Sequence, residues 1–305
     1  MKVLILGSNG LVGTSIKSVL SENDKVSDLI CATRDDADLF DFNETKELIQ
    51  NIKPDVLINA AAKVGGIYAN NSKRTEFILE NLKINVNILE ASIPLNEMYI
   101  INLGSSCIYP LNAVNPIKEG SVMSGKLEPT NSPYAMAKLT AIEIGEALSS
   151  QYGHKVLNLM PTNLYGPFDN FSETESHVIP GLIAKMHKAK VQQDKEFKIW
   201  GTGKPLREFL YVEDLSRAIE YLIFNRPVES LLNIGSGVEI SIYDLAKKIK
   251  NVIEFDGELR FDETKPDGNP RKLLDSSIIN NLGWSPKISL ENGLKLTYEW
   301  YLNSL

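Results

Sequence analysis

The chain has 305 residues, of which 43% are hydrophobic and 23% are charged, and its formal net charge is −7. This composition is that of a folded globular protein with about two domains, or with one large α/β domain. The acidic balance argues against the basic surfaces that bind nucleic acids or anionic membranes. Two cysteines and three histidines form neither a disulfide framework nor a zinc cage, so we expect a metal-free protein.

No segment of the sequence has the features of a membrane anchor or a targeting signal. No stretch approaches 18 consecutive apolar residues, and residues 1–6 lack the charged start and long apolar core of a signal peptide. No lipidation pattern closes the chain. We therefore expect a cytoplasmic protein.

The first half of the chain alternates between short apolar runs and helical patterns. Strands are predicted at 2–6, 27–32, 55–60, 98–103 and 155–160. Helices are predicted near 12–20, at 43–51 with Asn43 as the N-terminal cap, at 74–93 and at 133–152. Apolar runs without polar alternation are typical of parallel strands buried on both faces, so the sequence predicts a doubly wound parallel sheet.

The alternation weakens after residue 163. Residues 169–175 and 201–205 are loop-like, and short strands at 207–211 and 231–234 flank a helix at 212–225. We expect a first domain of residues 1–163, to which about 208–236 return. A smaller α/β domain would comprise residues 164–207 and 237–305.

Gly7, Gly10 and Gly13 lie between the first predicted strand and its helix. The first glycine permits a tight turn, the second lets the backbone approach a pyrophosphate, and the third lets the helix pack on the strand. The N–H groups at the helix start would then bind phosphate. A purely structural turn is the alternative, but the position after the first strand favours a dinucleotide site.

No acidic residue ends the second predicted strand, where NAD-binding proteins usually carry one for the ribose hydroxyls. The residue available there is Arg34, which suits the 2′-phosphate of NADP. In the alternative, Arg34 is a solvated loop residue and Asp35 or Asp36 binds NAD. We expect NADP(H).

Tyr134 and Lys138 are one turn apart at the start of a predicted helix and so share a face. A nearby ammonium lowers the pKa of a tyrosine, which would let Tyr134 exchange protons with a substrate oxygen. Ser105 and Ser106 follow a strand and could bind the same oxygen. A lone pair with this spacing is more often structural, but after a nucleotide loop it predicts a catalytic constellation.

Together these motifs resemble those of the extended short-chain dehydrogenase/reductases, a family with a Rossmann-type fold. The resemblance covers nearly the whole chain and is strongest to members that epimerise and reduce GDP-4-keto-6-deoxymannose. The matching blocks are 7–13, 59–67 with Asn70 and Asn71, 104–110, 128–138, 160–167, 176–180, 200–210 and 265–275.

The resemblance implies that Ser105, Tyr134 and Lys138 protonate the C4 oxygen of the sugar while NADPH delivers hydride. It implies Cys107 as the base that removes protons at C3 and C5, and His177 as the acid that returns them on the other face. A thiolate and an imidazole both titrate near neutrality, which suits these roles. In the alternative, Cys107 is a small buried hydrophobic residue and His177 a polar loop residue.

The resemblance also implies two binding sets and an assembly. The dinucleotide set is Gly7, Asn9, Gly10, Leu11, Val12, Arg34, Asn59, Ala60, Ala61, Tyr134, Lys138, Pro161, Asn163, Leu164 and His177. The GDP-sugar set is Ser106, Asn163, Lys185, Trp200, Arg207, Asp267 and Lys272, with Arg207 and Lys272 suited to the diphosphate. A homodimer would form through a bundle of the helices near 74–93 and 133–152.

Three features depart from the family pattern. Asn9 stands where many relatives carry a basic residue, Phe168 where they often carry a polar or small one, and residues 172–175 form a distinct loop. The last two lie near the expected sugar end. They motivate an alternative function, an NADPH-dependent C4 reductase of a related GDP-4-keto sugar such as a heptose, with little or no epimerase activity. A non-catalytic NADP sensor is disfavoured, because such proteins tend to lose the Tyr–Lys pair.

Overall fold

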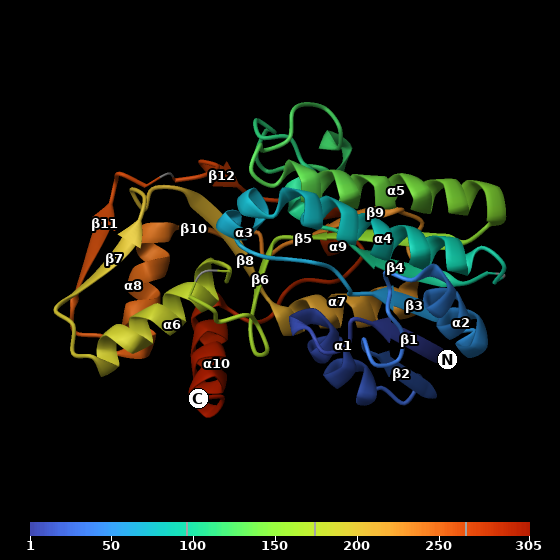
Figure 1. Ribbon diagram of the computed structural model, residues 1–305, viewed down its shortest axis with the longest axis horizontal. Coiled ribbons are helices and arrows are strands. Elements are labelled where there is room, and N and C mark those ends of the chain that lie inside the picture. The colour runs from blue at the N-terminus through green and yellow to red at the C-terminus, as the bar shows by residue number, and fades with distance from the viewer. Residues whose placement is uncertain (96, 174, 266) are drawn as a thin grey trace.

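The computed structural model describes residues 1–95, 97–173, 175–265 and 267–305. A large sheet with helices on both faces forms one part of the molecule, and a smaller part with its own short strands lies at one end of it (Figure 1). Within these described ranges, no helix combines the length and the apolar character needed to cross a membrane.

The large sheet has six parallel strands in the order β2-β1-β3-β4-β5-β9. They are β1 (Lys2–Leu6), β2 (Asp28–Ala32), β3 (Val56–Asn59), β4 (Tyr99–Leu103), β5 (Lys155–Pro161) and β9 (Leu231–Ile234). The strand order reverses between β1 and β3, and doubly wound sheets bind ligands outside the carboxyl ends at such a point. The predicted fold class is confirmed.

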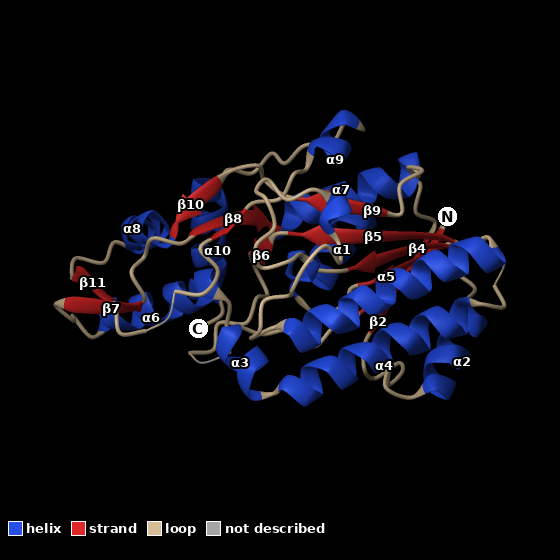
Figure 2. Ribbon diagram, turned by 90° about the horizontal axis from the view of Figure 1, so that it is seen from above, coloured by secondary structure: helices blue, strands red, loops and turns tan. Residues whose placement is uncertain are grey.

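Helices cover both faces of the large sheet (Figure 2). One face carries α1 (Leu11–Ser21), α7 (Val212–Asn225) and α9 (Ser277–Asn281), and the other carries α2 (Phe42–Ile52), α4 (Arg74–Ser92) and α5 (Ser132–Tyr152). In β1, Val3 and Ile5 pack toward the first set, whereas Leu4 and Leu6 pack toward the second. This burial on both faces explains why the strand is apolar at every position from Val3 to Leu6.

Two local features differ from the sequence prediction. The N-terminal cap of α2 is Asp41 rather than Asn43, because the Asp41 carboxylate accepts the main-chain N–H of Asn43 at 2.7 Å and of Glu44 at 3.0 Å. A carboxylate also interacts favourably with the helix dipole there. The short helix α3 (Ile67–Ser72) was not predicted, because six residues are too few for a periodic pattern.

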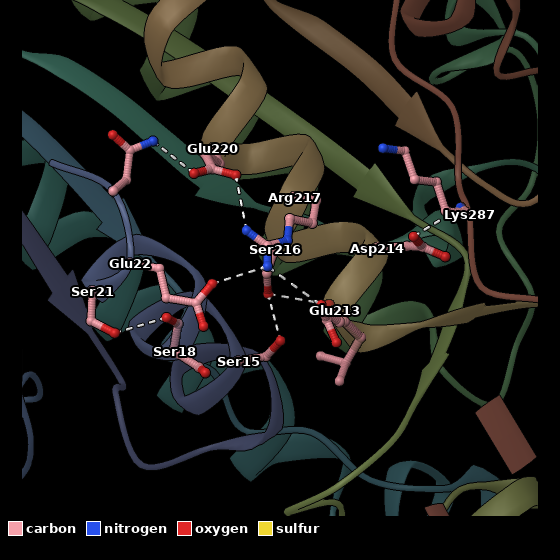
Figure 3. Close-up of polar contacts among 12 residues, drawn as sticks. Ser15, Ser18, Ser21, Glu22, Glu213, Asp214, Ser216, Arg217, Glu220 and Lys287 are labelled. Atoms are coloured by element: carbon pink, nitrogen blue, oxygen red, sulfur yellow. Dashed lines mark hydrogen bonds and ion pairs between the residues drawn. The ribbon is translucent and has the colours of Figure 1, made fainter. Parts of the chain in front are cut away.

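The helix α7 packs against α1 although the two are far apart in sequence (Figure 3). Ser216 Oγ donates a hydrogen bond to Ser15 Oγ at 2.7 Å, across 201 residues of sequence. Arg217 forms an ion pair with Glu22 at 3.2 Å, an exposed contact that adds little stability on its own. The packing itself comes from buried apolar residues of α7: Leu215, Ala218, Ile219, Leu222 and Ile223.

The smaller part of the molecule is built on β8 (Leu206–Tyr211). This strand pairs with β10 (Glu239–Ser241) on one side, and with β6 (Asn163–Tyr165) and β12 (Arg271–Lys272) on the other. A second pair of strands is β7 (Glu196–Trp200) with β11 (Glu258–Asp262), and the helices are α6 (Val178–Val191), α8 (Ile242–Ile253) and α10 (Leu290–Asn303). These elements enclose a separate apolar core.

Two segments pack differently from the expected division of the chain. We expected the strand at 207–211 to return with residues 208–236 to the large sheet, but β8 is the centre of the small sheet and the return begins at α7. Ile279 and Trp284 fall in the segment expected to form only the smaller domain, yet they lie in the core of the large sheet. Ile279 and Trp284 are apolar, and they are buried against the apolar residues of β9 and α7.

Glu208 connects the two sheets through a side chain that is 0% exposed. Its carboxylate accepts the N–H of Gly237 at 2.7 Å, after β9, and the N–H of Leu274 at 3.1 Å, after β12. Its main-chain carbonyl accepts a hydrogen bond from the Asn163 side chain at 2.8 Å. Burial raises the pKa of this carboxyl, and the hydrogen bonds that it accepts act in the opposite direction.

Candidate active site

The loop between β1 and α1 packs closely against the end of β3. Gly7 has a φ of +78°, and a Cβ there would lie 2.7 Å from main-chain atoms of Ala61. A Cβ at Gly13 would lie 2.2 Å from the carbonyl oxygen of Gly7, whereas one at Gly10 would have no neighbour nearer than 3.6 Å. The fold therefore requires glycine at the first and third positions, and Gly10 leaves open space beside the loop.

The other residues predicted for the dinucleotide lie at the carboxyl ends of the large sheet. Asn59 ends β3 and is buried, and Pro161 ends β5. Gly10 is the N-cap residue of α1. Because it has no side chain to cap the helix, the first N–H groups of α1 are available to bind an anion. The remaining residues follow these same strands: Asn9, Leu11, Val12, Ala60, Ala61, Asn163 and Leu164.

Arg34 is exposed directly after β2, and it forms no ion pair with any residue that the structure describes. The Asp36 carboxylate accepts hydrogen bonds from the N–H of Thr33 at 2.8 Å and its Oγ1 at 3.0 Å, which lowers the pKa of Asp36. Thr33 therefore fixes the Asp36 carboxylate through one of its oxygens, Oδ2. Arg34 is the cationic group at this strand end, and it fits a phosphate.

A buried network of asparagines lies beneath the same strand ends. Asn59 Nδ2 donates to Asn102 Oδ1 at 2.9 Å and to Asn85 Oδ1 at 3.0 Å, and Asn102 donates to Asn158 Oδ1 at 3.1 Å. Asn59 Oδ1 accepts the N–H of Ala61 at 3.1 Å, so the network holds the loop after β3 in place. The sequence analysis identified Asn59 but missed Asn85, Asn102 and Asn158. For Asn102 and Asn158, the available signal was a single amide side chain within an apolar strand.

Tyr134 and Lys138 are both buried on α5, beside Ser105. Ser105 lies close enough to the Tyr134 phenol to lower its pKa. Lys138 Nζ lies 5.8 Å from the centroid of the Tyr134 ring and donates to the carbonyl of Leu103 at 2.7 Å. The structure therefore brings the predicted triad together.

The pKa of Tyr134 shifts in the opposite direction from our expectation. Burial raises it, because the phenolate would lose its hydration; the nearby Cys107 acts in the same direction and Ser105 in the opposite one. Burial also lowers the pKa of Lys138 to about 8. A tyrosine that keeps its proton at neutral pH is suited to donate that proton to a substrate oxygen.

Cys107 is half-buried and packs in the same small apolar cluster as Tyr134. Its Sγ lies 3.3 Å from Asn131 Nδ2 and 3.7 Å from Lys272 Nζ. Both groups can donate a hydrogen bond to sulfur. Lys272, which we expected at a diphosphate, thus reaches the thiol in the structure.

Arg207 and Lys272 are paired residues on β8 and β12. Burial lowers the pKa of the Arg207 guanidinium, and the nearby groups Cys107 and Asp267 act in the opposite direction. The Asp267 carboxylate accepts both the N–H and the Oγ1 of Thr202 at 2.7 Å, so it holds the turn after β7. Two cationic side chains from the small sheet therefore border the thiol, where they suit an anionic substrate.

The other predicted substrate residues lie at different depths. Trp200 ends β7 with 65% of its surface exposed, and Lys265 Nζ lies 5.6 Å from the centroid of its ring. Lys185 is exposed on α6, whereas Ser106 is buried in the short helix after β4. The structure leaves Trp200 and Lys185 accessible to a ligand.

Phe168 has a φ of +66°, which is uncommon for an aromatic residue, and its ring packs on Trp300 of α10 with centroids 4.9 Å apart. This residue of the expected sugar end is therefore held by the C-terminal helix. Thr174 of the distinct loop at 172–175 lies outside the described residues, and so does Pro266 of the block 265–275.

Cys31, His154 and His187, which we expected to be structural, are not part of the apolar cluster of described residues that contains Tyr134 and Cys107. Cys31 packs against the core of the large sheet, where burial raises its pKa. His154 is buried, and His187 Nδ1 lies 2.9 Å from the hydroxyl of Tyr298.

His177 precedes α6 as its N-cap residue, and its side chain makes no capping hydrogen bond. The residue is exposed to solvent, yet the protein around the ring lowers its pKa, and the nearby main chain of Gly65 acts in the opposite direction. An effect that favours the protonated ring is that of a carbonyl oxygen. Gly65 in turn lies close to Phe77, because a Cβ on Gly65 would be 3.2 Å from the Phe77 ring. Phe77 packs edge-on against Tyr134, so Gly65 and Phe77 lie between His177 and Tyr134.

Comparisons with known proteins match this arrangement. Residues 3–235 match the family described as "NAD dependent epimerase/dehydratase family". GDP-L-fucose synthase 1 of Arabidopsis thaliana is 44% identical over 304 residues, which cover 100% of this chain and 94% of that protein. GDP-L-fucose synthase of Escherichia coli (strain K12) is 41% identical over 312 residues, which cover 99% of this chain and 97% of that protein.

Solved structures are similar over the whole chain as well. A GDP-6-OMe-4-keto-L-xylo-heptose reductase from C. jejuni has a TM-score of 0.93 at 32% identity, with coverage of 100% of this chain and 98% of that one. A GDP-L-fucose synthetase from Naegleria fowleri bound to NADP has a TM-score of 0.90 at 29% identity, with coverage of 99% and 94%.

Alanine substitutions should separate the roles of two glycines in the loop after β1. We expect Gly13→Ala to lower the free energy of unfolding by about 3 kcal/mol or more, because the new methyl would overlap the carbonyl of Gly7. Gly10→Ala should leave stability nearly unchanged but weaken binding of the dinucleotide, NADH or NADPH, by about tenfold or more, because its methyl fills the space beside the loop. Urea denaturation and fluorescence titration measure the two effects, and equal losses of stability would contradict this assignment.

Burial of Lys138 should make stability depend on pH. The pKa of about 8 in the folded protein lies below the roughly 10.4 of an unfolded chain, so the unfolded state binds more protons between these values. We expect the ligand-free protein to gain roughly 3 kcal/mol relative to Lys138→Met as the pH rises from 8 to 10.5. Urea denaturation at several pH values measures this difference. A difference that stays constant over that range would show that Lys138 does not titrate in this way.

Proposed function

This chain belongs to the NAD dependent epimerase/dehydratase family, and from that premise we propose that it is a GDP-L-fucose synthase. It converts GDP-4-keto-6-deoxymannose to GDP-L-fucose by epimerisation at C3 and C5 followed by reduction of the 4-keto group. Relatives with this name are 41% and 44% identical over nearly their full length, which supports the substrate.

The observation that carries the proposal is the position of Cys107 beside Tyr134. A ketone at C4 acidifies the C–H bonds at C3 and C5, so a base for these protons and a donor for the C4 oxygen must lie within one sugar ring of each other. Asn131 and Lys272 donate toward the sulfur and would stabilise the thiolate that takes the proton. Epimerisation and reduction can therefore share one site.

The side chains act in a defined order. Cys107 removes a proton next to the ketone, and Tyr134 with Ser105 donates hydrogen bonds to the C4 oxygen as it becomes an enolate. His177 then delivers a proton to the opposite face of the ring, which inverts that carbon. When bound, NADPH supplies the hydride for C4. Tyr134 gives its proton to the C4 oxygen in that final step, consistent with the raised pKa of its phenol.

We propose NADPH rather than NADH as the reductant. Arg34 is exposed at the end of β2 and suits a 2′-phosphate, whereas Asp36 is hydrogen-bonded to Thr33. The open space at Gly10 and the N-terminus of α1 fit the pyrophosphate. The solved structure from Naegleria fowleri bound to NADP adds support.

We also propose that the protein works in the cytoplasm. The mechanism needs Cys107 as a free thiol, and the reducing conditions of that compartment preserve such thiols.

The alternative is a C4 reductase of a GDP-4-keto-heptose that lacks epimerase activity. One observation favours it, the TM-score of 0.93 with a heptose reductase at 32% identity. Against it, a simple reduction gives no task to a thiol held by Asn131 and Lys272, or to His177. The two functions differ in whether protons at C3 and C5 exchange with solvent.

Deuterium labelling distinguishes these functions. With GDP-4-keto-6-deoxymannose and NADPH in heavy water, we expect GDP-L-fucose that carries deuterium at C3 and C5, detected by NMR. A reduced sugar without deuterium would contradict the epimerase and favour the alternative. Tyr134→Phe should lower the rate of NADPH oxidation by about a hundredfold or more, because the proton donor is lost, while the Kd for NADPH stays unchanged.

Tyr152→Phe is the matched control for this experiment. Tyr152 lies at the other end of α5 and is 46% exposed, so the same substitution there should leave NADPH oxidation unchanged. If Tyr134→Phe turns over at the wild-type rate, another group donates the proton. A parallel assay with NADH tests the preference for NADPH.

We further propose that two chains associate through α4 and α5, which pack side by side. Leu79 of α4 is 50% exposed and Met136 of α5 is 44% exposed, although both are apolar. A surface cavity of about 320 Å³ lies between the helices, lined by Arg74, Thr75, Ile78, Ser132, Pro133 and Met136. Such an apolar, hollowed surface suits a second copy of the same helices.

Sedimentation velocity tests this interface. We expect a dimer for the wild type and a monomer for Leu79→Glu, because a buried unpaired charge would oppose association. Val228→Glu is the control, since Val228 is an apolar residue that is 98% exposed and lies outside both helices. A monomeric wild type, or a dimer that survives Leu79→Glu, would contradict the proposal.

A further inference from the structure

The segment that carries His177 touches the two glycines that precede α3. Gly66 donates its N–H to the carbonyl of Glu175 at 3.0 Å, and Lys73 Nζ lies 2.5 Å from Glu175 Oε1. A Cβ on Gly66 would lie 2.6 Å from the carbonyl oxygen of Ser176. Any side chain at position 66 would therefore push the His177 segment away from α3.

Gly65 fills the other side of this contact. A Cβ there would lie 3.0 Å from Ala69 Cβ and 3.2 Å from Phe77 Cζ. Ala69 and Phe77 belong to the apolar cluster that contains Tyr134 and Cys107. The main chain of Gly65 and Gly66 thus fills the space between the His177 segment and this apolar cluster.

The close approach requires glycine at positions 65 and 66, and two glycines make the main chain flexible beside the segment that carries His177. Two successive glycines restrict the main chain very little, so the Gly65 carbonyl needs an anchor. Asn70 provides it, because its Nδ2 donates to the carbonyl of Gly65 at 2.7 Å and to that of Gly66 at 3.2 Å. Asn70 is only 7% exposed, so its amide is fixed by the packing around α3.

His177 is a residue that depends on such an anchor. Its ring is accessible to solvent and makes no capping bond with α6, so it could rotate freely without a partner. We assign the Gly65 carbonyl as that partner, because the main chain of Gly65 and Gly66 contacts Glu175 and Ser176, the two residues directly before His177. A carbonyl oxygen has two lone pairs, which allows one hydrogen bond from Asn70 and one from the ring.

We propose that Asn70 is a positioning residue for epimerisation, which fixes the Gly65 carbonyl that orients the ring of His177. The inference rests on the proposed function, in which His177 protonates the face opposite Cys107. One ring nitrogen donates to the carbonyl, and the other is then directed to the substrate. This gives a role to Gly65, Gly66 and Asn70 within the block 59–67 with Asn70 and Asn71, which the catalytic residues alone leave unexplained.

The test compares inversion with exchange at C3 and C5 in the protein without NADPH. In heavy water, Cys107 removes a proton, exchanges it with solvent and returns deuterium to the same face, which labels the sugar without inverting it. Inversion additionally needs His177. We expect Asn70→Leu to slow inversion about tenfold or more, because small misplacements of an acid are costly. Deuterium incorporation and the Kd for NADPH should stay within about twofold of wild type.

Leucine is chosen because it keeps the branching of asparagine at Cγ and removes the donors of the amide together with its oxygen. The Oδ1 atom of Asn70 is buried without a hydrogen-bond partner among the described residues, so its loss should not lower stability greatly. Asn71→Leu is the matched control, since Asn71 is the next residue of α3 and is exposed. This control should leave both rates unchanged.

The outcomes distinguish the inference from the function on which it rests. Wild-type protein that neither exchanges nor inverts the sugar would contradict the proposed function. If the wild type does both and Asn70→Leu slows neither, or slows both equally, the positioning role is wrong. If Asn70→Leu does not fold, Gly66→Ala decides, because its Cβ displaces Ser176 and should also slow inversion selectively. A full rate of inversion in Gly66→Ala would overturn the inference.

Discussion

The burial of one carboxylate, that of Glu208, sets the position of the small sheet relative to the large one. It accepts N–H groups from Gly237, after the last strand of the large sheet, and from Leu274, after β12. Buried donors are costly to leave unpaired, so these three segments must stay together. Lys272 lies two residues before Leu274 and reaches Cys107, which follows β4. The contact between a cation of one sheet and the thiol of the other therefore depends on this buried group.

The two sheets contribute different electrostatic environments to the site. On the large sheet, burial raises the pKa of Tyr134 and lowers that of Lys138, so both residues are shifted toward their neutral forms. The small sheet contributes Arg207 and Lys272 as adjacent cations. A sugar nucleotide has a similar division, since its ring is neutral and its diphosphate is anionic. The protein thus places a weakly charged reaction centre next to a cationic binding surface, although its net charge is −7.

The sequence predicted those features that depend on local patterns. Apolar runs identified β1 to β5, and fixed spacing identified the glycine loop and the pair of Tyr134 and Lys138 on one helical face. It failed where the outcome depends on contacts distant in sequence. A glutamate inside a short strand gave no sign that Glu208 is buried, and the contact of Lys272 with Cys107 spans 165 residues. The shift of the Tyr134 pKa was predicted in the wrong direction, because the extent of burial is a property of the packed structure.

The order in which the large sheet is assembled differs from the order of the chain. Its edge strand β9 comes from residues 231–234, and Trp284 completes the core on one face. While the ribosome is still making the intervening segments, β5 is an unpaired edge, and its apolar neighbours lack their cover. Such edges readily add strands from other chains. The nascent protein therefore passes through a long period in which it needs protection from aggregation, and this period ends only when almost the whole chain has emerged.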